Sequence, residues 1–129
     1  MIERLSPPGV AAPRGPYSPA VRAGDYIFVS GQVPVIPETN QTVLGDIRVE
    51  TRQVLNNITR ILEGCGATRA DVVKCQVYLT DVTDFAAMNE VYSEFFGEAK
   101  PARTTIGVVA LPLPNAKIEI DAVAYKPAR

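Results

Sequence analysis

Arg103 is the residue of this sequence whose type and setting point most directly to chemistry. It follows Pro101-Ala102 and precedes Thr104-Thr105-Ile106, and a proline followed by β-branched residues predicts that a strand begins here. Because side chains alternate along a strand, Arg103, Thr105 and Gly107 are expected to share one face. The small neighbours leave room in front of the guanidinium, whose fork matches a planar carboxylate. The spacing is also compatible with an arginine that extends into solvent or pairs with a neighbouring acid.

Glu119 is the second residue whose setting suggests chemistry. Residues 117–125 alternate in polarity, which predicts a strand with Lys117, Glu119 and Asp121 on one face. We expect this strand to lie antiparallel beside the Arg103 strand, so that a carboxylate and a guanidinium border one pocket. A glutamate on such a face can also be simply solvated.

Three further residues are candidates for shaping a pocket. Tyr17 lies among the prolines and glycines of residues 7–19, a stiff loop on which an aromatic ring either packs over a ligand or covers the edge of the core. Gly31 ends a predicted strand, where glycine marks a bulge or a close backbone approach. Asn89 borders the apolar stripe of a predicted helix, as a satisfied boundary residue or as a polar group facing a cavity.

The composition disfavours several other kinds of chemistry. The 129 residues include no histidine, and Cys65 and Cys75 form no CxxC pair, so we expect neither a metal site nor a disulfide framework, and a cytoplasmic, reducing location. A net charge of -1 without a lysine/arginine run gives no electrostatic footprint for nucleic acid. We expect no secretory signal and no membrane-spanning segment.

Hydrophobic periodicity predicts the elements that must position these residues. Residues 26–33 form a strand with Tyr26, Phe28 and Ser30 on one face and Ile27, Val29 and Gly31 on the other. A helix begins near the N-cap Asp46 and ends at Gly64-Cys65-Gly66. Its apolar stripe consists of Ile47, Thr51, Val54, Leu55, Ile58, Ile61, Leu62 and Cys65. Its polar remainder consists of Arg48, Glu50, Arg52, Gln53, Asn56 and Arg60.

The rest of the chain completes an α+β arrangement. Residues 71–80 read as a strand with Val73, Cys75, Val77 and Leu79 on one face, and residues 84–97 read as a second helix. The order strand, strand, helix, strand, helix, strand, strand predicts one domain over residues 1–129, with two helices on one face of a mixed sheet. The other face is expected to hold Tyr26, Phe28, Tyr78 and Val109, which predicts self-association.

Five segments of the sequence together resemble the Rid (YjgF) family, and within it the RidA branch of enamine/imine deaminases. They are Gly15-Pro16-Tyr17-Ser18-Pro19-Ala20, Val29-Ser30-Gly31-Gln32-Val33-Pro34, Asn89-Glu90-Val91-Tyr92, Pro101-Ala102-Arg103-Thr104-Thr105 and Lys117-Ile118-Glu119-Ile120. The resemblance runs nearly end to end. It implies a chorismate-mutase-like fold that assembles as a homotrimer, with active sites in the clefts between subunits.

The resemblance also implies roles for individual residues. Arg103 matches the arginine that binds the substrate carboxylate, and Glu119 matches the acid that positions or activates the attacking water. Tyr17, Gly31 and Asn89 match residues that shape the cleft. Thr105 stands where many relatives have cysteine, and its contribution is expected to come from backbone and a small polar side chain. Relatives commonly have an acidic residue where this sequence has Gly107 and a basic residue where it has Ala110. These differences leave the substrate preference open.

The implied activity is that of a 2-iminobutanoate/2-iminopropanoate deaminase. Such an enzyme hydrolyses 2-aminoacrylate- or 2-aminocrotonate-type intermediates to 2-keto acids and ammonia, without a metal or organic cofactor. A deaminase of the same superfamily acting on 2-aminomuconate is an alternative. So are a non-catalytic module or chaperone that binds small carboxylates and a translation-inhibiting ribonuclease. The acidic balance and missing histidine count against RNA cleavage.

Overall fold

Helix α1 (Ile47–Gly64) is the longest element, and the spacing of its apolar residues explains why it forms. The Asp46 carboxylate accepts hydrogen bonds from the backbone N–H groups of Arg48 and Val49, so it caps the helix start. The helix ends at Gly64, with Cys65 at its C-cap. Both predicted ends are confirmed.

The sheet has six strands, whose order across it is β1-β2-β3-β6-β4-β5. In this computed structural model, which describes residues 1–127, the strands are β1 (Ile2–Leu5), β2 (Ala20–Ala23), β3 (Tyr26–Gln32), β4 (Val72–Leu79), β5 (Ala102–Gly107) and β6 (Ile118–Tyr125). Neighbouring strands are antiparallel except β4 and β5, which are parallel. The sheet is therefore mixed, as predicted, but two short strands precede Tyr26 where the sequence indicated one.

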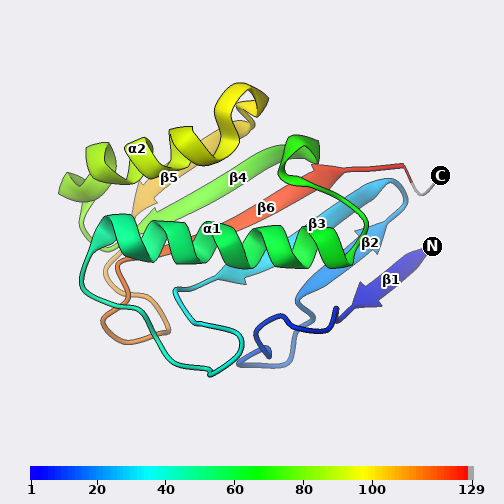
Figure 1. Cartoon of the computed structure of the whole chain (residues 1–129), viewed down its shortest axis with the longest axis horizontal. Coiled ribbons are helices and arrows are strands. Elements are labelled where there is room, and N and C mark those ends of the chain that lie inside the picture. The colour runs from blue at the N-terminus through cyan, green and yellow to red at the C-terminus, as the bar shows by residue number, and fades with distance from the viewer. Residues whose placement is uncertain (128–129) are drawn as a thin grey trace.

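Two helices cover one face of this sheet, which confirms the predicted α+β arrangement. Helix α2 (Phe85–Phe96) lies beside α1 on the same side (Figure 1). Short 3₁₀ turns occupy Arg69–Asp71, Val82–Asp84 and Gly97–Ala99. Within residues 1–127, no helix has the length and apolar character needed to cross a membrane.

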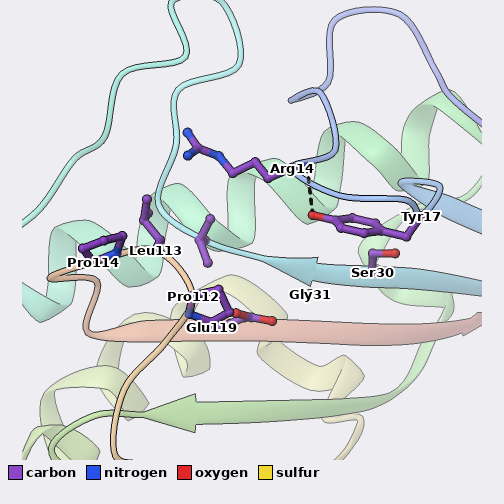
Figure 2. A pocket seen from close by; sticks show the side chains of 9 residues that line it. Arg14, Tyr17, Ser30, Gly31, Pro112, Leu113, Pro114 and Glu119 are labelled. Atoms are coloured by element: carbon purple, nitrogen blue, oxygen red, sulfur yellow. Dashed lines mark hydrogen bonds between the residues drawn. The ribbon is translucent and has the colours of Figure 1, made fainter.

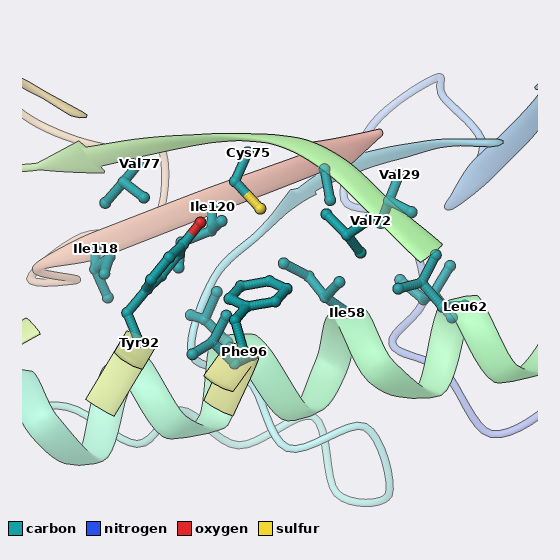
Figure 3. Packing of buried hydrophobic residues seen from close by; sticks show 14 of the residues in the cluster. Val29, Ile58, Leu62, Val72, Cys75, Val77, Tyr92, Phe96, Ile118 and Ile120 are labelled. Atoms are coloured by element: carbon teal, nitrogen blue, oxygen red, sulfur yellow. The ribbon is translucent and has the colours of Figure 1, made fainter. Parts of the chain in front are cut away.

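The core fills the space between the helices and the sheet. Figure 3 shows Ile58 and Leu62 of α1 and Phe96 of α2 packed against the strands. The strand side includes Val29, Val77, Ile118 and Ile120. Full burial of one such aliphatic side chain contributes about 1.5–3 kcal/mol. The helix-facing side of the sheet is therefore fixed by many contacts that hold the strands in place.

The opposite face of the sheet is uncovered. Tyr26, Phe28 and Tyr125 are each about half exposed there, at 45%, 47% and 44%, and the rings of Tyr26 and Tyr125 meet edge to face at 5.2 Å. Tyr78 also lies on this face, where its hydroxyl bonds to Gln76 and Asp121. Val109 does not belong to it, because β5 ends at Gly107 and Val109 is fully exposed in the following loop.

Two β-bulges correct the predicted faces of two residues. The pairing of β4 with β6 shifts between Val72 and Lys74, so Val72 is buried and Val73 is exposed. The pairing of β3 with β6 shifts between Val29 and Gln32, which turns Gln32 inward and Gly31 toward the uncovered face. An extra residue in one strand reverses the alternation beyond it, and the sequence does not mark where it is inserted.

Glu50 is completely buried, although helical spacing places it outside the apolar stripe of α1. Its carboxylate accepts hydrogen bonds from the backbone N–H of Gly45 at 2.8 Å and of Lys117 at 2.7 Å. These bonds satisfy a buried charge. They also tie the entrance of α1 to the residue immediately before β6, the strand that contains Glu119.

Candidate active site

A cleft of about 510 Å³ opens where the β3 bulge, β6 and two loops meet. Its lining residues are Arg14, Tyr17, Ser30, Gly31, Val33, Pro112, Leu113, Pro114 and Glu119. Figure 2 shows these side chains around one open space. The cleft thus brings together three residues singled out in the sequence, namely Tyr17, Gly31 and Glu119.

The bulge at Gly31 creates the room that Glu119 occupies. A Cβ atom at position 31 would lie 2.9 Å from Glu119 Cδ and would overlap Oε2, so only glycine leaves the carboxylate where it is. Figure 2 shows the Glu119 carboxylate beside Gly31. The glycine is required here for a close approach of a side chain, and its place on the uncovered face follows from the bulge.

The Glu119 carboxyl group has a raised pKa. Burial is the larger cause, and the negative charge of Asp121 on the same strand is the second. Burial also raises the pKa of Asp121, although a hydrogen bond from Tyr78 opposes the rise. A carboxylate whose pKa lies above the usual range is a better proton acceptor at neutral pH than an ordinary glutamate.

The loop that presents Tyr17 is tied to the bulge. Ser30 Oγ donates to the carbonyl of Ser18 at 2.7 Å, and the backbone N–H of Ser30 donates to the carbonyl of Pro19 at 3.0 Å. The Tyr17 hydroxyl accepts a hydrogen bond from the backbone N–H of Arg14 at 3.2 Å (Figure 2). The ring is therefore fixed at the mouth of the cleft while about half of it stays exposed.

Arg103 lies apart from this cleft, on the helix-covered side of the sheet. Its guanidinium carbon is 4.7 Å from the centre of the Tyr92 ring and 5.5 Å from that of Phe85, both on α2. Because β5 pairs in parallel with β4, and β4 separates it from β6, the expected antiparallel neighbours Arg103 and Glu119 are not neighbours. The expectation that they border one pocket of a single chain is wrong.

Thr105 and Asn89 belong with Arg103. Thr105 follows Arg103 by two residues on β5, and its hydroxyl oxygen is buried without a hydrogen-bond partner among residues 1–127. Asn89 is half-buried on α2, four residues after Phe85 and three before Tyr92, so it shares their side of the helix. Gly107 ends β5 and Ala110 is exposed in the next loop, and neither lines the cleft.

Sequence reasoning missed several residues of these two groups, among them Arg14, Phe85 and Tyr92. Arg14 lines the cleft, but a single arginine in a proline-rich loop gave no signal. Phe85 and Tyr92 are apolar residues at helical spacing, which is typical of the core-facing side of a helix, and only their contacts reveal that they also hold Arg103. The sequence did contain a signal for this contact: two aromatic residues lie seven positions apart on a helix, and an arginine follows on the next strand.

Neither cysteine lines the cleft. Burial raises the pKa of the Cys75 thiol to about 11, although the nearby Tyr92 hydroxyl and Arg103 oppose the rise. Burial also raises the pKa of Cys65. Neither thiol is activated as a nucleophile. In the part of the chain that the structure describes, no cluster of three acidic or cysteine residues forms a metal site.

Comparisons with known proteins show the family to which the chain belongs. The domain model described as Endoribonuclease L-PSP matches residues 9–126. A RutC family protein of Pyrococcus horikoshii is 54% identical over 114 residues, which are 88% of this chain and 90% of that protein. A 2-iminobutanoate/2-iminopropanoate deaminase of Dermatophagoides farinae is 41% identical over 119 residues, 92% of each chain.

A solved structure extends the likeness to three dimensions. The crystal structure of E. coli TdcF with bound serine superimposes with a TM-score of 0.89 at 35% identity, over 96% of this chain and 98% of that one. Matches that extend over nearly the whole chain, in sequence and in fold, place this protein in the YjgF/Rid family, whose domain is described as Endoribonuclease L-PSP.

Proposed function

We propose that the protein is an enamine/imine deaminase that hydrolyses short 2-imino acids to 2-keto acids and ammonia. The observation on which this rests is the Arg103 guanidinium, which no acidic side chain among residues 1–127 pairs with and which two aromatic rings hold in place. An unpaired, oriented guanidinium is suited to a planar carboxylate. The relative of D. farinae is named for this reaction.

In the proposed reaction, the enamine first tautomerises to the imine. A water oxygen then bonds to C2 of the imine while its proton passes to Glu119, and the nitrogen takes up that proton to give a carbinolamine. Transfer of the remaining hydroxyl proton to nitrogen breaks the C–N bond, which releases ammonia and the 2-keto acid. The raised pKa of Glu119 suits both proton transfers, and Arg103 holds the carboxylate throughout.

The proposal requires two copies of the chain for each site. Arg103 lies on the helix-covered side of the edge strand β5, whereas Glu119 lies on the uncovered face of β6. A second copy that covers the exposed aromatic residues of that face can bring its own Arg103 to the cleft. We therefore retain the homotrimer with active sites between subunits as part of the proposal. We also retain the cytoplasm as the proposed location, because both cysteines are free thiols.

Replacement of Arg103 tests the proposed carboxylate contact. Arg103→Ala removes two charge-assisted hydrogen bonds, so turnover of 2-aminocrotonate in a dehydratase-coupled assay should fall at least about 100-fold. Arg103→Lys should lose most activity, because a point charge does not replace the fork. Arg69→Ala is the matched control, since Arg69 also lies over a ring of α2, at 5.2 Å from Phe95. Equal turnover by the wild type and Arg103→Ala would reject the proposal.

Ribonuclease activity is the second candidate, favoured by the description of the family's domain. The chain has no histidine and a net charge of -1, which supplies neither an imidazole acid/base pair nor a basic surface. We expect RNA binding that is weak and lost at physiological salt. A salt titration with single-stranded RNA measures this, and tight binding that survives 150 mM salt would favour the ribonuclease instead.

A further inference from the structure

Phe85 is an apolar residue whose position is unusual for its type. It is the first residue of α2 and is 44% exposed, and it is absent from the set of residues that form or pack against the core. Its ring instead lies 5.5 Å from the guanidinium carbon of Arg103. The ring therefore lies outside the buried core, and its described contact is with the cation.

Tyr92 completes an aromatic cradle, by which we mean Phe85 and Tyr92 together. The two residues are seven positions apart, or about two helical turns, so they project from the same side of α2. Tyr92 differs from Phe85 in that it is buried within the core. Its hydroxyl is directed toward the Cys75 sulfur, deeper in the core, where it makes no regular hydrogen bond (Figure 3). Tyr92 therefore packs in the core besides its contact with Arg103, whereas Phe85 lies outside that core.

We infer that Phe85 is a positioning residue, which acts with Tyr92 to hold the Arg103 guanidinium in the orientation that binds a carboxylate. This rests on the proposed function of Arg103. An arginine side chain has several rotatable bonds, and binding an anion costs it that freedom. Attraction between a cation and two ring faces restricts the side chain before the ligand arrives, without using its N–H donors. Less freedom is then lost on binding, which strengthens it.

A series at position 85 separates this role from packing. The strength of cation–ring attraction falls from tryptophan through phenylalanine to leucine, which has no ring face. We expect Phe85→Leu to raise the Kd for 2-ketobutyrate about two- to fivefold, measured by titration calorimetry, and Phe85→Trp to restore tight binding. In turnover, KM should rise in Phe85→Leu by a similar factor with kcat little changed, because bound substrate and transition state use the same grip.

Phe95→Leu is the matched control on the same helix. Phe95 holds Arg69 at 5.2 Å and packs against the core, so this variant should lose at least as much stability while its Kd stays at the wild-type value. If Phe95→Leu weakens 2-ketobutyrate binding as much as Phe85→Leu does, the cradle is rejected in favour of general loosening of α2. Equal affinities for the Leu and Trp variants at position 85 reject it as well.

A measurement without ligand keeps this inference separate from the proposed function. The heteronuclear NOE of the Arg103 Nε–H group, assigned with Arg103→Lys, should be lower in Phe85→Leu than in the wild type. Absence of 2-ketobutyrate binding by the wild type would contradict the proposed function alone. An unchanged NOE in Phe85→Leu would show that Phe85 does not restrain Arg103, and would overturn the cradle whatever the protein binds.

Discussion

Glu119 and Asp121 show how one strand sets the chemistry of a single residue. They are two positions apart on β6 and face the same side, so the charge of Asp121 opposes ionisation of Glu119, while burial opposes ionisation of both groups. Asp121 has the Tyr78 hydroxyl as a hydrogen-bond donor at 3.2 Å. Among the described residues, no hydrogen bond opposes the rise in the pKa of Glu119. Glu119 is therefore the better proton acceptor of the two.

The pH dependence of turnover should reveal the raised pKa of Glu119. A general base is active when it is ionised, so activity should fall as the pH is lowered through a midpoint above the ordinary glutamate value of 4.5. Asp121→Asn removes the second cause of the rise and leaves burial, so the midpoint should move to lower pH. Glu119→Gln should lower kcat by about 100- to 10,000-fold, while calorimetry shows 2-ketobutyrate still binding. A Glu119→Gln variant with wild-type kcat contradicts the assignment.

At the scale of elements, hydrophobic periodicity predicted where the helix α1 begins and ends, but it did not predict how the strands pair. The bounds of α1 followed from the spacing of Ile47, Val54 and Ile58 and from the cap at Asp46. The bulges that turn Val73 outward and Gly31 toward Glu119 depend on contacts between strands far apart in sequence. For the same reason, the sequence identified the candidate residues, but the prediction that the strands of Arg103 and Glu119 are neighbours was wrong.

Glu50 connects two elements of the fold, although its place outside the apolar stripe of α1 is typical of a surface residue. Its carboxylate joins Gly45 and Lys117, so Glu50→Ala should lower the free energy of unfolding by about 3 kcal/mol, because two bonds to a charged acceptor are lost and two buried N–H groups are left unpaired. Denaturant unfolding measures this. Glu63→Ala, at an exposed position of the same helix, should stay within about 0.5 kcal/mol of the wild type. A Glu50→Ala variant as stable as the control would show that Glu50 does not anchor β6.

At the scale of the whole molecule, one sheet separates the two groups that the proposed chemistry needs. The helix-covered side holds Arg103, Thr105 and the aromatic cradle, and the uncovered face holds Glu119 and its cleft. The half-exposed rings of Tyr26, Phe28 and Tyr125 on that face favour contact with another copy. Closed symmetric assembly would create as many complete sites as there are subunits, each from two different chains.

Mixing two inactive variants tests this division directly. Arg103→Ala retains Glu119, and Glu119→Gln retains Arg103. A site built from two chains therefore contains both groups when its Arg103 comes from a Glu119→Gln chain and its Glu119 comes from an Arg103→Ala chain. With equal amounts and random exchange, about one-quarter of the sites should be complete, and turnover should recover to about that share of the wild-type rate. The control mixes Arg103→Ala with the double variant Arg103→Ala/Glu119→Gln, which contains no intact Arg103 and should stay inactive. If both mixtures stay inactive although native mass spectrometry shows mixed oligomers, the two groups act within one chain or not at all, and the intersubunit site is excluded.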